Sequence, residues 1–316
     1  MESRRAIKTA IGKIILIGEH AVVYGEPSIA IPFPGVSIKT TICETIGPVI
    51  LECYYYRGRL SDSPKAVLGL KKVIEGVTES FNEKLENFSI HIASTIPPAR
   101  GMGSSAAVAI STIRALYEFF NRTLTENELL KWAHESEKVV HGSPSGIDAA
   151  VVGGERPLYY RKGMPFVPFK INLDAYLVVG DTGREGQTRE AVEGVRQFIE
   201  SKPDEGMELI KELGNLTRLA RKSIEDKDAE KLGKAMFKAH IILDKLGVSN
   251  DKLNFLVSKA LDCGALGAKL TGGGRGGCMI ALADDRKKAN YISQCLLSSG
   301  AKNTWINRLG DDLVGS

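Results

Sequence analysis

The residues best suited to chemistry lie in one short segment, Pro97-Pro-Ala-Arg-Gly-Met-Gly-Ser-Ser-Ala-Ala107. Gly101 and Gly103 allow the backbone to turn sharply and to approach a ligand closely. Ser104 and Ser105 follow at the predicted start of a helix, where unpaired N–H groups and a partial positive charge favour anions. Their hydroxyls can donate to phosphate oxygens, and one could reach a bound Mg²⁺ ion. The segment therefore predicts a phosphate-binding loop.

The loop does not follow the best-known phosphate-binding patterns. It lacks the GxxxxGK[ST] spacing of a Walker A loop, and GxGxxG does not fit at Gly101-Met-Gly-Ser-Ser-Ala106. A glycine-rich turn with serine helix caps would explain the same residues without any ligand. The residues of this segment alone leave both interpretations open.

Strand and helix patterns indicate how this loop is placed. Strands are expected at 13–18, 36–43 and 88–93, and the last runs directly into the loop. A helix is expected from about 105 to 120, because five apolar residues are spaced for one face: Ala107, Ile110, Ile113, Leu116 and Phe120. A second helix is expected from 125 to 140, where Thr125 and Glu128 have the spacing of a capping box.

The second half of the chain changes character. A strand at 175–180 leads into a polar turn at 181–186. The chain then reads as helical from 188 to about 247, with breaks near Lys202-Pro203 and Gly214, followed by strands at 268–271 and 278–282 around a glycine-rich turn. We therefore predict two domains, 1–185 and 186–316.

Composition limits the class of protein. The 316 residues are 43% hydrophobic, which is enough for substantial cores. The net charge of +4 is small, so it suits an enzyme that handles anionic nucleotides better than a protein that binds nucleic acid. No apolar run approaches the roughly 20 residues of a membrane helix, and residues 14–17 are too few for a signal-peptide core. We expect a cytoplasmic protein with neither nucleic-acid nor membrane partners.

The cysteines predict no covalent framework. The five residues, Cys43, Cys53, Cys263, Cys278 and Cys295, are widely spaced and form no CxxC pair. This pattern argues against a zinc site or a set of disulfides and favours buried thiols.

The phosphate loop also resembles a family motif. Residues 97–106 are similar to P-x-x-x-G-x-G-S-S-A, the central motif of the GHMP kinases (galacto-, homoserine, mevalonate and phosphomevalonate kinases). The family's other two motifs are present in the same order, as KIILIGEHAVVYG at 13–25 and KLTGGGRGGC at 269–278. The resemblance implies an α+β fold of two domains with the active site in the cleft between them. Within the third motif, the glycines of residues 272–277, interrupted only by Arg275, would allow the backbone to pack close to the phosphate loop, although a plain hairpin would explain them almost as well.

The resemblance assigns roles to individual residues. Asp148 matches the family's catalytic aspartate, which takes the proton of the attacking hydroxyl, and Lys13 matches the lysine that pairs with it. Ser105 and Glu137 match the pair that binds Mg²⁺. Glu135 competes with Glu137, but a helix would point it elsewhere. The predicted ATP-binding residues form one continuous run: Pro98, Ala99, Arg100, Gly101, Met102, Gly103, Ser104, Ser105, Ala106, Ala107 and Val108.

The acceptor is implied by two variants of the motifs. GEHAVVYG at 18–25 and HGSPSGID at 141–148 resemble the mevalonate-phosphorylating members, whereas galactokinases have Gly-Glu-His-x-Asp in the first motif. The predicted acceptor-binding residues are Glu19, His20, Asp148, Thr182 and Arg184, with Arg184 placed to pair with a carboxylate. The resemblance implies Mg²⁺- and ATP-dependent phosphorylation of the 5-hydroxyl of (R)-mevalonate, in the mevalonate route to isoprenoids.

Other interpretations remain. The chain could be a GHMP kinase for phosphomevalonate or homoserine, although a phosphorylated acceptor would require more Lys or Arg at the pocket than Arg184. An inactive ligand-binding relative is disfavoured, because Lys13, Ser105 and Asp148 are intact. The sequence does not reveal the oligomeric state and leaves a homodimer open.

Overall fold

Two long strands near the N-terminus, β1 (Arg5–Ile17) and β2 (Pro27–Pro48), contribute residues to both units of the fold. The structure, a computed structural model, describes residues 4–141 and 146–310. Unit 1 contains the residues up to 12, 36–97 and 103–155, whereas unit 2 contains 13–35, 98–102 and the residues from 156 onwards. The predicted domains, 1–185 and 186–316, are continuous in sequence, whereas each unit combines several segments, and that domain boundary stays a prediction.

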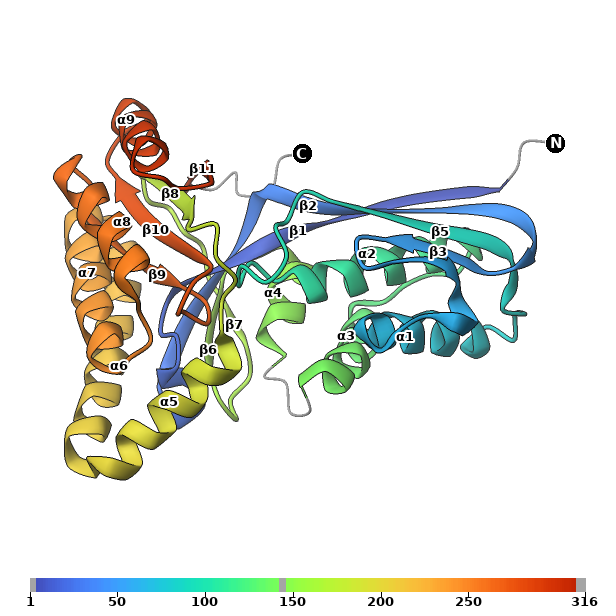
Figure 1. Ribbon diagram of the computed structural model, residues 1–316, viewed down its shortest axis with the longest axis horizontal. Helices are drawn as coiled ribbons and strands as arrows, with labels where there is room; N and C mark the ends of the chain where they lie inside the picture. The colour runs from blue at the N-terminus through green and yellow to red at the C-terminus, as the bar shows by residue number, and fades with distance from the viewer. Residues whose placement is uncertain (1–3, 142–145, 311–316) are drawn as a thin grey trace. The chain divides into compact units, whose positions relative to one another are not determined.

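Unit 1 is a sheet with helices on one face (Figure 1). Its strands follow the order β4-β3-β5-β2, and β1 pairs with β2. Phe88 of β5 lies 5.7 Å from Phe119 of α2 between ring centroids, so aromatic side chains join the sheet to its helices. The elements that complete this unit are β3 (Ile50–Cys53), β4 (Tyr56–Arg59), β5 (Glu86–Ser94), α1 (Leu68–Ser80), α2 (Ser104–Phe119), α3 (Glu126–His141), α4 (Ile147–Gly154) and 3₁₀ turns at Leu60–Asp62 and Lys65–Val67.

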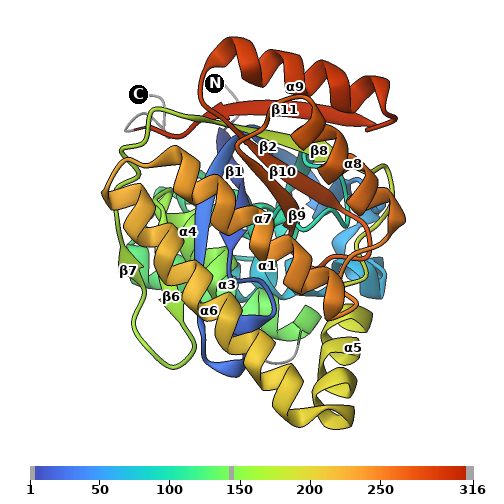
Figure 2. The same cartoon turned by 90° about the vertical axis from the view of Figure 1, so that its left-hand side faces the viewer.

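Unit 2 is built on an antiparallel sheet of order β11-β8-β10-β9. Its strands are β8 (Tyr176–Asp181), β9 (Gly267–Thr271), β10 (Cys278–Ala283) and β11 (Asn303–Arg308). Helices α7 (Ala229–Lys245), α8 (Asp251–Asp262) and α9 (Arg286–Ser298) cover one face of it (Figure 2). The remaining elements are a 3₁₀ turn at Ala21–Tyr24, β6 (Leu158–Arg161), β7 (Val167–Pro168), α5 (Thr188–Ser201) and α6 (Pro203–Glu225).

The helix signals read from the sequence are confirmed where they rest on caps. The capping box at the start of α3 is present: the Thr125 amide donates to Glu128 at 3.0 Å, and the Glu128 amide donates to the Thr125 hydroxyl at 3.3 Å. Helix α6 begins at Pro203, as the Lys202-Pro203 break predicts. Both units combine mostly antiparallel strands with helices packed on them, which is the α+β class that the sequence indicates.

Two sequence-based expectations were wrong. Gly214 does not interrupt a helix but lies inside α6, where a Cβ atom would come within 1.9 Å of a Glu26 carboxylate oxygen. Its lack of a side chain therefore provides a close contact rather than a turn.

The cysteines were the second error. Cys263, just after α8, and Cys295 in α9 form a disulfide with their Cα atoms 6.7 Å apart, whereas Cys43, Cys53 and Cys278 are free thiols. Adjacent helices on one face of the sheet bring together two cysteines that are 32 residues apart in sequence.

Within residues 4–141 and 146–310, no helix has both the length and the apolar character needed to span a membrane.

Candidate functional site: a phosphate loop and an acceptor turn

The first half of the phosphate loop, residues 98–102, is held within unit 2 by backbone contacts. The Lys13 amide donates to the Met102 carbonyl at 3.0 Å, and the Gly186 amide donates to the Ala99 carbonyl at 2.8 Å. Gly101 has a φ of 74°, and a Cβ atom on Gly272 would lie 3.2 Å from the Gly101 Cα. The glycine-rich turn at 272–277 therefore packs against this half of the loop, as its glycines predict.

Arg100 is a structural anchor of the loop. Its guanidinium donates through Nε to Asp181 Oδ1 at 2.8 Å and through Nη1 to the Pro98 carbonyl at 3.1 Å. The Arg100 side chain is 7% exposed and that of Asp181 is fully buried, and the Gly183 amide donates to the same Oδ1. The guanidinium therefore joins the loop to the end of β8, and this contact gives Arg100 a role besides the predicted one at the nucleotide.

The second half of the loop opens helix α2 in unit 1. Gly103 is the N-cap with a φ of 74°, and the Ala107 amide donates to its carbonyl at 2.9 Å. Ser104 and Ser105 are the first helical residues, and the Ser105 side chain is exposed. The N-cap glycine carries no side chain that could satisfy the first N–H groups, so the serines are not caps and this helix end suits an anion.

Glu137 and Asp148 also belong to unit 1. Glu137 on α3 is buried, whereas the exposed Glu135 forms a 2.8 Å ion pair with Lys138. The two carboxylates therefore differ in their surroundings, and the assignment of Glu137 as a Mg²⁺ ligand stays a prediction. Asp148 is half-buried in the first turn of α4, after the N-cap Gly146 with a φ of 74°. Residues 142–145 of the motif HGSPSGID lie outside the described residues.

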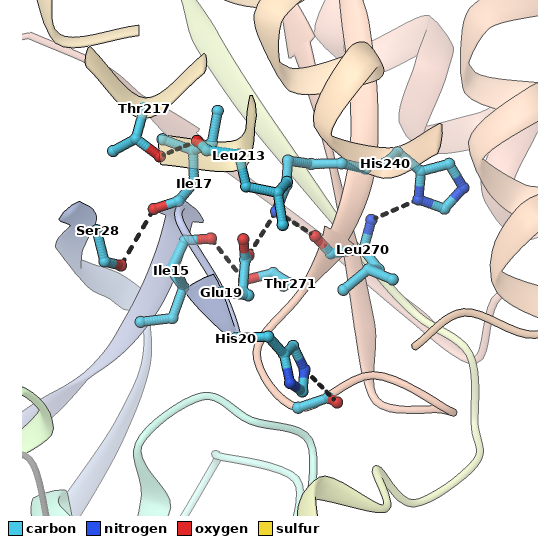
Figure 3. Close-up of polar contacts among 12 residues, drawn as sticks. Ile15, Ile17, Glu19, His20, Ser28, Leu213, Thr217, His240, Leu270 and Thr271 are labelled. Atoms are coloured by element: carbon cyan, nitrogen blue, oxygen red, sulfur yellow. Dashed lines mark hydrogen bonds and ion pairs between the residues drawn. The ribbon is translucent and has the colours of Figure 1, made fainter. Parts of the chain in front are cut away.

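In unit 2, Glu19 and His20 follow Gly18 at the end of β1; the Glu19 side chain points towards β9 and the His20 ring towards the glycine-rich turn (Figure 3). The Glu19 carboxylate accepts a hydrogen bond from Lys269 of β9, and both side chains are almost completely buried. The His20 ring lies 3.0 Å from the Gly273 carbonyl through Nε2. Burial, with the nearby charges of Lys269 and Arg275, lowers the pKa of His20 to about 4, so the ring is neutral at pH 7.

The turn after β8 is ordered by Thr182. Its amide donates to the Gly277 carbonyl at 3.0 Å, its hydroxyl donates to the same carbonyl at 2.7 Å, and the Arg184 amide donates to the hydroxyl at 3.2 Å. Thr182 is buried and Arg184 is exposed. Thr182 thus fixes the turn, and Arg184 is the side chain of this segment that a solvated carboxylate can reach.

The predicted site residues are divided between the two units. Unit 2 contains Lys13, Glu19, His20, 98–102, Thr182 and Arg184, and unit 1 contains 103–108, Glu137 and Asp148. The pairing of Lys13 with Asp148 stays a prediction. The pairing of Lys269 with Glu19 was not predicted; the lysine between Ala268 and Leu270 in a short strand could have indicated a buried cation, but not the identity of its partner.

Comparison with known proteins gives a consistent result. Two family models match the chain, GHMP kinases N terminal domain at residues 70–154 and GHMP kinases C terminal at residues 220–302. A mevalonate kinase of Pyrococcus abyssi is 36% identical over 312 residues, which cover 90% of each chain.

Solved structures resemble the chain over nearly its full length. The L. major mevalonate kinase in complex with R-mevalonate has a TM-score of 0.83 and 25% identity, covering 99% of this chain and 97% of that one. The mevalonate kinase of methicillin-resistant Staphylococcus aureus has a TM-score of 0.76 and 35% identity, covering 97% and 99%.

Proposed function

Because this chain belongs to the GHMP kinase family, we propose that it transfers the γ-phosphoryl group of ATP to the 5-hydroxyl of (R)-mevalonate. The observation that carries the proposal is the loop at 97–107, which leads from β5 into the glycine-capped start of α2. Relatives named mevalonate kinase at 36% and 35% identity support the choice of acceptor. The products are 5-phosphomevalonate and ADP, and we expect the reaction in the cytoplasm.

The nucleotide phosphates are proposed to bind at Gly101, Gly103 and the first turn of α2. Backbone N–H groups at the start of a helix attract anions, and glycines permit the close approach. Ser104 and Ser105 add hydroxyl donors at the same helix end. The remaining predicted residues of the run 98–108 shape this cradle by their backbone.

The residues present suit a magnesium ion that arrives with ATP. Mg²⁺ is usually bound in kinases by one or two protein oxygens together with phosphates and water. Unit 1 offers one carboxylate, the buried Glu137, and one hydroxyl, the exposed Ser105. Within the described part of the chain no three His, Cys, Asp or Glu residues are grouped to hold a metal without substrate. When bound, the ion would neutralise charge on the transferring phosphoryl group.

Asp148 and Lys13 are proposed to activate the acceptor. The Asp148 carboxylate takes the proton of the 5-hydroxyl as that oxygen forms its bond to the γ-phosphorus, and the bond to the ADP oxygen breaks. Lys13 favours the ionised form of the carboxylate and of the developing alkoxide. An aliphatic alcohol is a weak nucleophile, so the position of these groups matters more than their intrinsic reactivity.

The acceptor is proposed to bind at the turns of unit 2. Arg184 is exposed and offers a fork of donors for the mevalonate carboxylate. His20 is neutral and is better suited to a hydroxyl than to a carboxylate. Glu19 already accepts from Lys269, and Thr182 already donates to Gly277, so their part in acceptor binding is proposed to be mainly the shape of the pocket.

A coupled ADP-release assay with mevalonate, phosphomevalonate, homoserine and galactose tests the proposal. We expect turnover on mevalonate alone. Turnover on another acceptor without turnover on mevalonate would refute the substrate while leaving the kinase. Asp148→Asn should lower kcat by at least about a hundredfold with nucleotide binding retained. A loss below about tenfold would mean that Asp148 is not the base.

A further inference from the structure

Lys269 and Glu19 form an ion pair that is almost completely withdrawn from water within unit 2. Their side chains are 0% and 2% exposed. Burial lowers the pKa of Lys269, and the Glu19 carboxylate opposes that shift. Among the described residues Glu19 Oε2 has no hydrogen-bond partner, so Lys269 is the side chain that holds this carboxylate. A buried charge pair is weak evidence for stability and therefore invites a functional explanation.

The pair is one of three contacts that join residues 15–20, at the end of β1 and just after it, to residues 269–273, at the end of β9 and just after it. Lys269 contacts Glu19, the Thr271 hydroxyl donates to the Ile15 carbonyl at 2.7 Å, and the Gly273 carbonyl lies 3.0 Å from the His20 ring (Figure 3). Residues 269 and 271 are alternate positions of β9, whose side chains point to the same face. This face of β9 and the glycine-rich turn beyond it therefore hold the Glu19–His20 turn.

His20 needs such support because its backbone is strained. Its φ is 59° and its ψ is −45°, in the positive-φ region that a residue with a Cβ rarely adopts. Residues in such conformations persist where surrounding contacts fix them, and they are frequent at ligand sites. The backbone conformation of His20 therefore depends on the contacts that hold this turn, including that of the adjacent Glu19 with Lys269.

The contact with Gly273 also determines which His20 nitrogen carries the proton. A carbonyl oxygen only accepts hydrogen bonds, so Nε2 must be the donor in the 3.0 Å contact. In the neutral ring Nδ1 then carries a lone pair. His20 can accept a hydrogen bond from a hydroxyl through Nδ1, and it does not carry the charge needed to pair with a carboxylate.

We propose that Lys269 is a positioning residue, whose buried pair with Glu19 fixes the turn so that His20 offers Nδ1 as an acceptor to a hydroxyl of the acceptor substrate. This inference rests on the proposed function and deepens it. Glu19 then acts through Lys269 and the backbone of His20 instead of touching the substrate.

A neutralised pair tests the proposal by kinetics. Lys269→Met alone would leave a buried carboxylate without its cation and could fail to fold, so the variant of choice is K269M/E19Q, which removes both charges at similar size. We expect the KM for mevalonate to rise about tenfold, as for the loss of one well-placed hydrogen bond, while the KM for ATP stays within about twofold.

A matched control is available in the same unit. Arg218 donates to Glu26 at 2.6 Å, and this pair also joins the N-terminal segment to the C-terminal part of the chain, but it is partly exposed and lies outside the proposed site. R218M/E26Q should leave both KM values within about twofold of wild type. A mevalonate KM in K269M/E19Q that is no higher than in the control would overturn the proposal, as would equal rises in both KM values.

Imidazole ¹⁵N NMR provides a readout that does not require turnover. The His20 signals, assigned with His20→Gln, should show the Nε2–H tautomer and remain neutral down to about pH 4 in the wild type. In K269M/E19Q we expect a higher pKa or a mixture of tautomers, because the Lys269 charge and the fixed turn are both lost. If mevalonate is not a substrate, the proposed function fails, and the NMR measurement then tests the positioning role of Lys269 by itself. Unchanged His20 signals in K269M/E19Q would overturn that role, and altered signals would support it.

Discussion

Replacement of Arg100 should show how strongly the phosphate loop depends on its anchor at β8. Arg100→Met leaves the fully buried Asp181 carboxylate without its cation. Breaking a buried pair by removing one partner costs about 3–5 kcal/mol. Asp181 Oδ2 has no hydrogen-bond partner among the described residues, so the carboxylate would stay poorly satisfied. The Gly183 amide still donates to Oδ1 at 2.8 Å, and because of this remaining hydrogen bond we expect a loss near the lower end of that range, about 3 kcal/mol.

The matching variant on the other side should cost less. Asp181→Asn keeps an oxygen for Gly183 and Arg100 but replaces a charge-assisted hydrogen bond with a neutral one, a loss of about 1–2 kcal/mol. In R100M/D181N no buried charge of the pair remains, so the double variant should be more stable than the sum of the single losses predicts, by about 2 kcal/mol. Urea unfolding of the four proteins measures this coupling.

Kinetics on the same variants connect the anchor to function. Because Arg100 holds residues 98–102, Arg100→Met should raise the KM for ATP about tenfold, the effect of roughly one lost hydrogen bond at the phosphates. Arg218→Met breaks a partly exposed pair and should cost less than about 1 kcal/mol. An Arg100→Met loss no greater than this control, or strictly additive losses in the cycle, would refute the anchoring role.

Four further outcomes follow from the structure. Reduction of Cys263–Cys295, or Cys295→Ser, should lower the free energy of unfolding by about 3–4 kcal/mol, because the bridge closes a loop of some 32 residues. Urea unfolding with and without a reductant measures this loss, and equal stability would mean that the bridge is absent in solution. Thr125→Ala should cost about 1 kcal/mol, measured as a lower unfolding midpoint, by removing the capping box of α3. Gly214→Ala should destabilise unit 2, because its Cβ would overlap Glu26, and Glu26→Ala in the same chain should restore part of the loss. Burial lowers the pKa values of His20 and His240 to about 4, so below pH 6.5 the unfolded chain binds more protons than the folded one. The free energy of unfolding should therefore fall between pH 6.5 and pH 4, by up to about 3 kcal/mol per histidine. His240→Gln should make this pH dependence less steep in urea unfolding at a series of pH values, and an unchanged slope would contradict the reasoning.

Local signals in the sequence predicted the parts of the site that depend on local structure. The strand at 88–93, the loop after it and helix α2 follow from periodicity and glycine chemistry that a short window contains. The capping box at Thr125 is equally local. The function of the loop could not be predicted from its own residues, because a glycine-rich turn with serine caps explained them equally well. The other two motifs were needed to favour a phosphate-binding loop.

What escaped prediction depends on contacts between distant residues. Strand β2 runs through Pro32 and Pro34, residues that usually argue against a strand because proline cannot donate to a ladder. Glu19 and Lys269 are 250 residues apart, and nothing in either neighbourhood identifies the other as its partner. The same holds for Arg100 with Asp181. Only the three-dimensional structure of unit 2 shows that each of these buried charges has a partner of opposite charge.

The central claim is that this chain places a phosphoryl group on the 5-oxygen of mevalonate. The most direct measurement is ³¹P NMR of the product formed from ATP and (R)-mevalonate, with ADP quantified in the same sample. We expect one equivalent of phosphomonoester per ADP, with the phosphorus coupled to the two protons on C5. Formation of ADP without a phosphorylated mevalonate, or a phosphate on the 3-oxygen without coupling to C5 protons, would contradict it.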